Sequence, residues 1–380
     1  MLTFDSPEAV GLDIDRWEAA CRLARDWCQR DVIPSLALIV GRGDIATKPR
    51  FFGRQRLDVD SAPLGDDAIF LIASITKPIV ATGAMLLIER GLLTLGDRVH
   101  EVIPEFAGKG RYAITIRHLL THTSGLPDML PNNVPLREAH APLSEFVAGT
   151  CGVQPSFRAG RSVQYQSMGF AVLGEIVARI SGVSCAEFLQ REIFGPLEMN
   201  DMALGAPSDW FSGAEPRISR VPEIRPPAGQ DPNSDWGWNS PYWQRLGAPW
   251  GGLLTTPADL ARFAQMMLNN GKVGTTTQLL GRATVRAATR NQLCEMADVP
   301  EVDRRCKPWG LGWRLHWPTH SANFGDLLGP RTYGHWGATG TVLWIDPELD
   351  AFAIILSTQP QEPHGKQLAR LSNALASAIR

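Results

Sequence analysis

Apolar and polar positions near the start of the chain predict one helix and a pair of strands. Within residues 13–29 the apolar side chains recur at helical spacing and share one face, which is typical of an amphipathic helix. Residues 35–40 are apolar without interruption and precede a glycine-rich turn, as expected of a buried strand. Residues 51–54 could return beside that strand as its partner.

The end of the chain shows a similar mixture of strands and helices. Apolar runs at residues 341–345 and 351–356 enclose a short polar turn, which predicts a hairpin. Residues 366–380 predict a closing amphipathic helix. Because both ends of the chain carry strands flanked by helices, we expect them to share one domain.

The middle of the chain is mainly helical in its pattern. Helices are expected at residues 74–93, 116–121, 170–180, 186–194 and 257–269. Residues 205–250 form a long connection rich in proline and tryptophan. A connection of that length inside a globular protein is usually functional, and we interpret it as the wall of a binding site.

These patterns predict an α/β (α+β) protein with two domains. Residues 1–72 and 251–380 would form a discontinuous sheet-and-helix domain, and residues 73–250 an inserted, mostly helical one. A ligand site is expected in the cleft between the two domains.

Composition and charge exclude several classes of function. The net charge of the 380 residues is −2 and no basic stripe occurs, so nucleic acid is not an expected partner. No run of 18 apolar residues predicts a membrane span. The acidic first 17 residues lack the apolar run of a signal peptide, and together with six scattered cysteines they predict a cytoplasmic protein with free thiols.

No metal or cofactor is expected either. His118 and His122 have the spacing of a zinc-binding helix, but no glutamate follows His118. We therefore expect a small-molecule ester or amide as the binding partner, and the sequence leaves the oligomeric state open.

The strongest chemical signal begins at Ser74, which opens the only S-x-x-K motif of the chain. Chance would supply on the order of one such match in a chain this long, so its context matters. An apolar strand-like run precedes it and a helix follows, so Lys77 would lie on the same helix face as the Ser74 hydroxyl. A serine needs a base to become nucleophilic, and a lysine of lowered pKa can provide one. The alternative is a helix cap followed by a surface lysine.

Two later motifs change that balance. Tyr165-Gln166-Ser167 precedes a predicted helix, and His335-Trp336-Gly337-Ala338 precedes the predicted hairpin. In this order, the three motifs resemble the serine β-lactamase and penicillin-binding-protein superfamily. The class C-like branch fits best, and within it the family VIII carboxylesterases. Segments 118–126 and 250–263 also resemble this branch.

The resemblance implies a fold and a set of roles. The fold would be an antiparallel sheet flanked by helices, built from both termini, with an inserted helical domain. Tyr165 would share proton transfer with Lys77, and the backbone N–H groups of Ser74 and Ala338 would form an oxyanion hole. Ser167, His335, Trp336, Gly337 and Trp250 would contact the substrate.

Departures from the resemblance bear on the substrate. Ser167 replaces the asparagine usual in lactamases of this branch, and His335 replaces their lysine, which removes a permanent charge. Trp336 and Trp250 suggest an aromatic-lined acyl pocket. These features favour a carboxylesterase for small or medium acyl groups. The alternatives are a β-lactamase, a D-amino-acid peptidase or amidase, an acyltransferase, and a catalytically silent scaffold.

Overall fold

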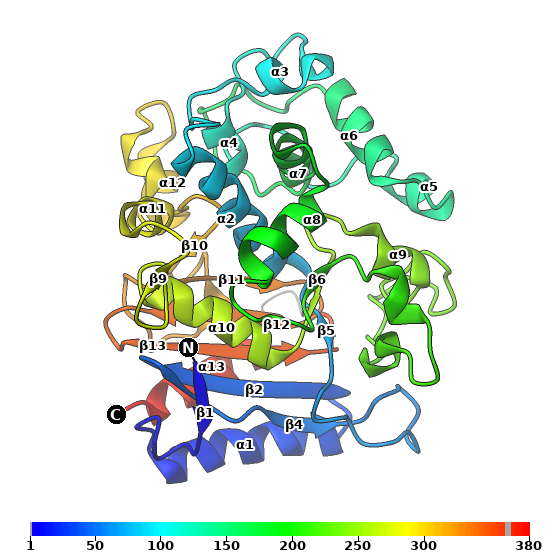
Figure 1. Ribbon diagram of the computed structural model, residues 1–380, viewed down its shortest axis with the longest axis vertical. Coiled ribbons are helices and arrows are strands. Elements are labelled where there is room, and N and C mark those ends of the chain that lie inside the picture. The colour runs from blue at the N-terminus through cyan, green and yellow to red at the C-terminus, as the bar shows by residue number, and fades with distance from the viewer. Residues whose placement is uncertain (1, 362–365) are drawn as a thin grey trace.

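A large sheet lies between a pair of helices and a broader helical region in the computed structural model (Figure 1). The structure describes residues 2–361 and 366–380. Met1 and residues 362–365 belong to the predicted sheet-and-helix domain but lie outside the described residues. In Figure 1 the sheet occupies the lower half of the molecule and most helices lie above it.

The large sheet has eight strands, and among the described residues only its β1–β3 pair is parallel. Its strands come from the two ends of the chain, so the mostly antiparallel sheet flanked by helices is confirmed. The exact domain boundaries stay a prediction. In spatial order the strands are β1 (Thr3–Asp5), β3 (Ile45–Thr47), β2 (Ser35–Arg42), β13 (Ala351–Ser357), β12 (Thr341–Asp346), β11 (Tyr333–Gly337) and β10 (Arg314–Leu315), with β4 (Arg50–Gly53) also paired to β2.

Alternate residues of the central strands enter two separate cores. In β2, Leu36 and Leu38 face one core with helices α1 (Ile14–Gln29) and α13 (Lys366–Ala378), whereas Ala37 and Ile39 face the other with the main helical region. This division follows from the two-residue repeat of a strand. The predicted strands at both chain ends and their pairings are therefore confirmed.

The predicted helices are present, with one informative difference. The helix predicted over residues 74–93 is a tight turn, η1 (Ala73–Ile75), followed by α2 (Thr76–Glu89). The helices are α1 (Ile14–Gln29), α2, α3 (Val99–Val102), α4 (Ile116–Leu120), α5 (Asn133–Glu138), α6 (Leu143–Gly152), α7 (Met168–Ser181), α8 (Cys185–Leu189, continued by a wide turn, Gln190–Phe194), α9 (Pro241–Leu246), α10 (Pro257–Leu268), α11 (Arg282–Ala288), α12 (Glu301–Cys306) and α13 (Lys366–Ala378).

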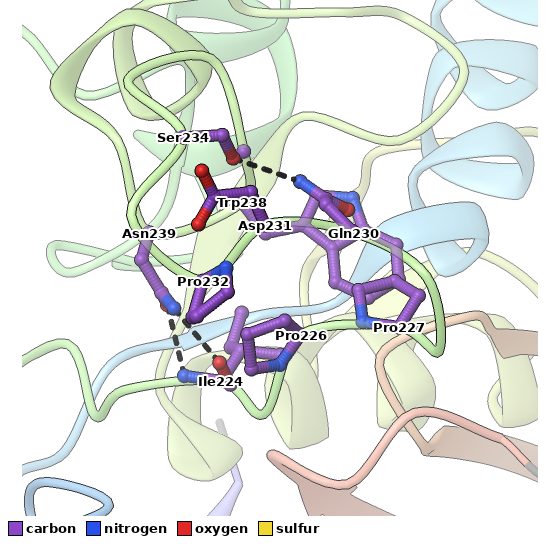
Figure 2. A pocket seen from close by; sticks show the side chains of 10 residues that line it. Ile224, Pro226, Pro227, Gln230, Asp231, Pro232, Ser234, Trp238 and Asn239 are labelled. Carbon is purple, nitrogen blue, oxygen red and sulfur yellow. Dashed lines mark hydrogen bonds between the residues drawn. The ribbon is translucent and has the colours of Figure 1, made fainter.

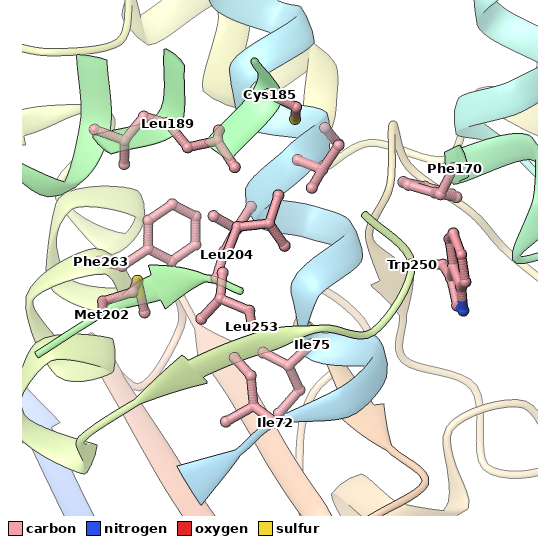
Figure 3. Packing of buried hydrophobic residues seen from close by; sticks show 14 of the residues in the cluster. Ile72, Ile75, Phe170, Cys185, Leu189, Met202, Leu204, Trp250, Leu253 and Phe263 are labelled. Carbon is pink, nitrogen blue, oxygen red and sulfur yellow. The ribbon is translucent and has the colours of Figure 1, made fainter. Parts of the chain in front are cut away.

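A small sheet joins distant segments next to η1. Strand β7 (Leu253–Thr255) pairs with both β5 (Phe70–Leu71) and β6 (Ala203–Leu204). Figure 3 shows Leu253 and Leu204 packed in the apolar cluster that surrounds α2. A second small pair consists of β8 (Lys272–Val273) and β9 (Thr277–Gln278).

The long connection at residues 205–250 is ordered by local contacts. The Asn239 side chain accepts a hydrogen bond from the Ile224 N–H at 2.9 Å and donates one to the Ile224 carbonyl at 2.8 Å. Figure 2 shows this clamp beside a small pocket lined by prolines and Trp238. Its predicted role as a binding-site wall stays a prediction.

Two expectations about chemistry can be compared with the described residues. All six cysteines are free. No single described helix is long and apolar enough to cross a membrane, although the bent pair of α7 with residues 185–194 reaches that composition when joined.

Candidate active site

Ser74 lies in a strained turn that exposes its side chain. The preceding residue, Ala73, has a φ of +44°, a left-handed conformation that costs a non-glycine residue about 1–2 kcal/mol. Between residues 68 and 87 Ser74 is the only residue that is not buried. Two hydrogen bonds to Leu253 hold the turn. The Ile72 N–H donates to the Leu253 carbonyl at 3.0 Å, and the Leu253 N–H donates to the Thr76 Oγ1 at 3.1 Å.

Lys77 is completely buried one turn beyond Ser74. Its Nζ lies 3.1 Å from the Ser74 Oγ and 2.8 Å from the backbone carbonyl oxygen of Trp250. Burial lowers the pKa of Lys77 to about 7; Asp128 opposes this shift and Arg314 adds to it. Because the carbonyl can only accept an N–H, a neutral Lys77 can direct its lone pair at the serine hydroxyl.

Tyr165 packs over the lysine. The Lys77 Nζ is 4.7 Å from the centre of the Tyr165 ring. Burial raises the pKa of Tyr165. The positive charge of Arg314 and the nearby Ser74 hydroxyl offset part of this increase. The buried phenol oxygen has no hydrogen-bond partner among the described residues. The tyrosine therefore lies beside the serine with a free hydroxyl.

His122 holds the backbone on both sides of Tyr165. The Gln164 N–H donates to the His122 carbonyl at 2.9 Å, and the Gln166 N–H donates to the His122 Nδ1 at 3.1 Å. The imidazole also packs against the Tyr165 ring, with 4.7 Å between ring centres. Segment 118–126, which showed no chemistry of its own, thus orients the tyrosine.

Strand β11 ends directly against the nucleophile turn. Thr339 Oγ1 donates to the Leu71 carbonyl at 2.7 Å, and Thr341 Oγ1 donates to the Ile72 carbonyl at 3.0 Å. A Cβ on Gly337 would clash with the Ile72 carbonyl oxygen, so only glycine permits this approach. Exposed Ala338 follows beside the turn.

The two N–H groups predicted for the oxyanion hole are available. Among the described residues, the N–H groups of Ser74 and Ala338 donate none of the hydrogen bonds found in loops, caps and turns. Their assignment to an oxyanion hole stays a prediction.

His335 is fully buried, whereas Trp336 is partly exposed. The Trp336 N–H donates to the His335 Nδ1 at 3.0 Å. Burial, with a contribution from Arg314, holds the pKa of His335 well below its usual value, so this histidine is neutral at pH 7. Position 335 of strand β11 therefore carries no positive charge at pH 7.

The fold and these motifs can now be compared with known proteins. The sequence profile of the Beta-lactamase family matches residues 22–378. The chain belongs to the Beta-lactamase family. Penicillin-binding protein 4 of Amycolatopsis lactamdurans is 31% identical over 72% of this chain and 67% of its own.

Solved structures of the same fold include proteins with different activities. A penicillin-binding protein homologue from Caulobacter crescentus has a TM-score of 0.78 and 21% identity, covering 96% of this chain and 98% of its own. A family VIII carboxylesterase has a TM-score of 0.74 and 19% identity, covering 94% and 97%. The resemblance to this superfamily is therefore confirmed, while a particular substrate is not determined.

Two other residues predicted to contact substrate have defined places in this Beta-lactamase-family fold. Ser167 is buried, and its hydroxyl donates to the Asp128 carboxylate at 2.6 Å. The Trp250 ring lies in the apolar cluster (Figure 3). Its centre is 5.4 Å from that of the Phe146 ring and 6.4 Å from that of the Trp243 ring. The Trp250 carbonyl, rather than its ring, binds Lys77, and substrate contact by either residue stays a prediction.

Sequence reasoning missed two charged residues of this site, Arg314 and Asp128. Arg314 lies on the edge strand β10, in a stretch with no recognised motif, and its guanidinium carbon is 5.2 Å from the Tyr165 ring centre. The only sequence signal was an arginine between two apolar residues, which is weak.

No group of three or more potential ligands for a metal ion occurs among the described residues.

Proposed function

We propose that this serine hydrolase of the β-lactamase fold acts through an acyl-enzyme, with Ser74 as nucleophile and an ester as its substrate. One observation carries the proposal: the Lys77 Nζ lies between the Ser74 hydroxyl and the Trp250 carbonyl, at 3.1 and 2.8 Å. A surface lysine after a helix cap would be solvated and fully charged. Lys77 is buried, and at pH 7 a large fraction of it is neutral.

Acylation forms a bond between the Ser74 Oγ and the acyl carbon, breaks the bond to the alcohol and moves one proton from the serine to that alcohol. Neutral Lys77 accepts the Ser74 hydroxyl proton as the Oγ attacks the ester carbonyl carbon. The N–H groups of Ser74 and Ala338 would hold the developing oxyanion, which is usually the largest single contribution in acyl transfer. Collapse breaks the bond to the alcohol, whose oxygen takes a proton from Lys77 directly or through the Tyr165 phenol.

Deacylation reverses these roles with water. The neutral lysine accepts a proton from a water molecule as the water oxygen attacks the acyl carbon. The bond to the Ser74 Oγ breaks, the Oγ takes the proton back, and the acid leaves. The Tyr165 ring packs over the Lys77 amine, so its phenol can relay the proton between Lys77 and the leaving alcohol or the attacking water.

The preference for an ester rests on the third motif. His335 is neutral and buried, so strand β11 itself offers no cation to grip a substrate carboxylate. The partly exposed Trp336 ring next to it offers an apolar surface instead. The fold neighbour that is a family VIII carboxylesterase supports the same choice.

A second candidate is hydrolysis of a peptide or β-lactam that carries a carboxylate. The observation that favours it is Arg314, a permanent cation whose guanidinium carbon is 4.5 Å from the Trp336 ring centre. The relative named as a penicillin-binding protein adds support for this alternative.

Labelling by a fluorophosphonate tests the nucleophile, and a substrate panel tests the class. We expect the intact protein to be labelled and Ser74→Ala to be unlabelled, while Ser144→Ala, a change at a helix position away from the site, labels normally. p-Nitrophenyl acetate and butyrate should be hydrolysed faster than a chromogenic cephalosporin or a D-alanyl-D-alanine peptide. Labelling that persists in Ser74→Ala would refute the mechanism, and a faster cephalosporin or peptide reaction would refute the ester assignment.

A further inference from the structure

A guanidinium lies inside the active site without belonging to any of its motifs. Arg314 is only 6% exposed and pairs with Gly334 at the edge of the sheet. Its guanidinium carbon lies 4.5 Å from the ring centre of Trp336, 4.8 Å from that of Trp309 and 5.2 Å from that of Tyr165. Three aromatic rings therefore surround one positive charge.

This charge is poorly compensated. The Arg314 Nη1 donates to the His320 carbonyl at 2.8 Å, but the buried Nε has no partner. Among the described residues Arg314 forms no ion pair. Burying an unpaired cation costs several kcal/mol even after relaxation, so stability alone gives no reason for an arginine at this position.

We propose that Arg314 is a positioning residue: it supplies a fixed positive charge against the Tyr165 ring that covers the Lys77 amine, and this charge opposes protonation of the lysine. The inference rests on the proposed roles of Ser74 and Lys77 and deepens them. A positive charge held near an amine disfavours its protonation, and the same charge over the Tyr165 ring stabilises a phenolate there.

The other ionisable groups around the site leave this role to Arg314. His122, His320 and His335 are neutral at pH 7, because burial holds the pKa of each well below its usual value. The pKa of Arg314 is lowered by burial only to about 10, so it stays charged.

Two charged side chains, Arg314 and Asp128, act on the proton-handling pair in opposite directions. Burial is the main cause of both shifts, but Arg314 lowers and Asp128 raises the pKa of Lys77, and the same holds for Tyr165. Removing the arginine should therefore move the pKa of the lysine upward, and removing the carboxylate should move it downward.

The rate of fluorophosphonate labelling of Ser74, measured from pH 5.5 to 10, tests this inference in the full-length protein. The rising limb is the pH range over which the labelling rate increases. For Arg314→Gln and Arg314→Met we expect this limb to move to higher pH. If the pKa of Lys77 rises by about one, the rate at pH values well below the original pKa falls about tenfold, while the rate at high pH is unaffected. Arg314→Lys, which keeps a charge, should stay within about threefold of the wild type at every pH.

The matched control is Arg137→Gln. The Arg137 guanidinium also stacks on two rings, 4.2 Å from that of Trp243 and 4.8 Å from that of Trp236, and its Nε is likewise buried without a partner. Arg137→Gln should leave the rising limb at the same pH as in the wild type.

Each outcome decides one question. Wild-type protein that is not labelled at Ser74 refutes the proposed function. Two results refute the inference but leave the proposed function standing. In one, Ser74 is labelled and the labelling rate rises over the same pH range in the wild type and in the neutral Arg314 variants. In the other, Arg314→Lys loses activity equally at all pH values. If both neutral variants fail to fold, Arg314→Lys still tests the inference, because a limb that moves to higher pH although the charge is kept refutes it.

Discussion

The hydroxyl of Ser167 donates a 2.6 Å hydrogen bond to the carboxylate of Asp128. Ser167 directly precedes helix α7 and lies two residues after Tyr165, so this bond holds a negative charge next to the proton-handling pair. That charge raises the pKa of both Lys77 and Tyr165 against the influence of Arg314. The second motif thus sets the electrostatics of the site as well as its geometry.

Activity should rise with pH, and Asp128→Asn should move that rise. Neutral Lys77 is the active form, so kcat/KM for a p-nitrophenyl ester should increase through about pH 7 and then level off. Asparagine keeps an acceptor for Ser167 but removes the charge, so the limb should move to lower pH. Asp66→Asn, at an exposed site, is the control. An unchanged limb in Asp128→Asn would contradict the electrostatic role.

Lys77→Met should remove activity without weakening the fold. Loss of a general base typically costs about 10²–10⁴-fold in rate, and steady-state hydrolysis would measure it. Methionine keeps much of the buried volume of the side chain and needs no charge to be desolvated. Circular dichroism should show an unchanged melting temperature or a higher one at pH 7, and a large decrease would contradict this view.

The same lysine should make stability depend on pH in a predictable direction. Its pKa is about 7 in the folded protein and 10.5 in its ordinary state, so between these values the unfolded chain holds a proton that the folded one lacks. The free energy of unfolding should therefore rise with pH from about 7 to about 10.5. Urea titrations at pH 7 and 9 should show a smaller rise in Lys77→Met than in the wild type.

Gly337→Ala should disrupt the contact between β11 and the nucleophile turn. An added Cβ would clash with the Ile72 carbonyl oxygen and with Thr341 Oγ1. Overpacking of this kind costs about 1–3 kcal/mol, and fluorophosphonate labelling should fall as the turn shifts. Gly152→Ala, where no atom lies within 4 Å of the added carbon, should be neutral or slightly stabilising. Equal stabilities for the two variants would contradict the tight junction between strand and turn.

Thiol chemistry should divide the six cysteines. Cys294 is exposed and Cys306 partly so, whereas the other four are buried. Burial raises the pKa of Cys21 to about 11 and that of Cys185 to about 12. A thiol reagent at pH 8 should modify Cys294 first, without loss of ester hydrolysis, and the buried cysteines only in denaturant. Rapid modification of all six would contradict the burial.

The sequence predicted what depends on short spacing and on periodicity. Ser74 and Lys77 lie three residues apart on a helical turn, so their contact followed from the motif. The strands around residues 35–40 and 341–356 were recognisable because their apolar runs are buried on both faces.

What depends on the folded chain could not be predicted. The left-handed Ala73 shortens the helix at its start, and nothing in an alanine indicates that conformation. The acceptor for Lys77 at residue 250 is a main-chain atom, which leaves no trace in side-chain chemistry. Arg314 reaches the site only because β10 pairs with β11, and no motif marked that strand.

The peptide oxygen of Trp250 has one more consequence. Every amino acid carries that atom, so exchanging the side chain at position 250 leaves the lysine's second partner in place. A substitution at this position would therefore disturb the packing against Phe146 and Trp243 while the catalytic amine keeps its hydrogen-bond acceptor. Any loss of activity in such a variant should come from the altered core and not from a missing partner of the lysine.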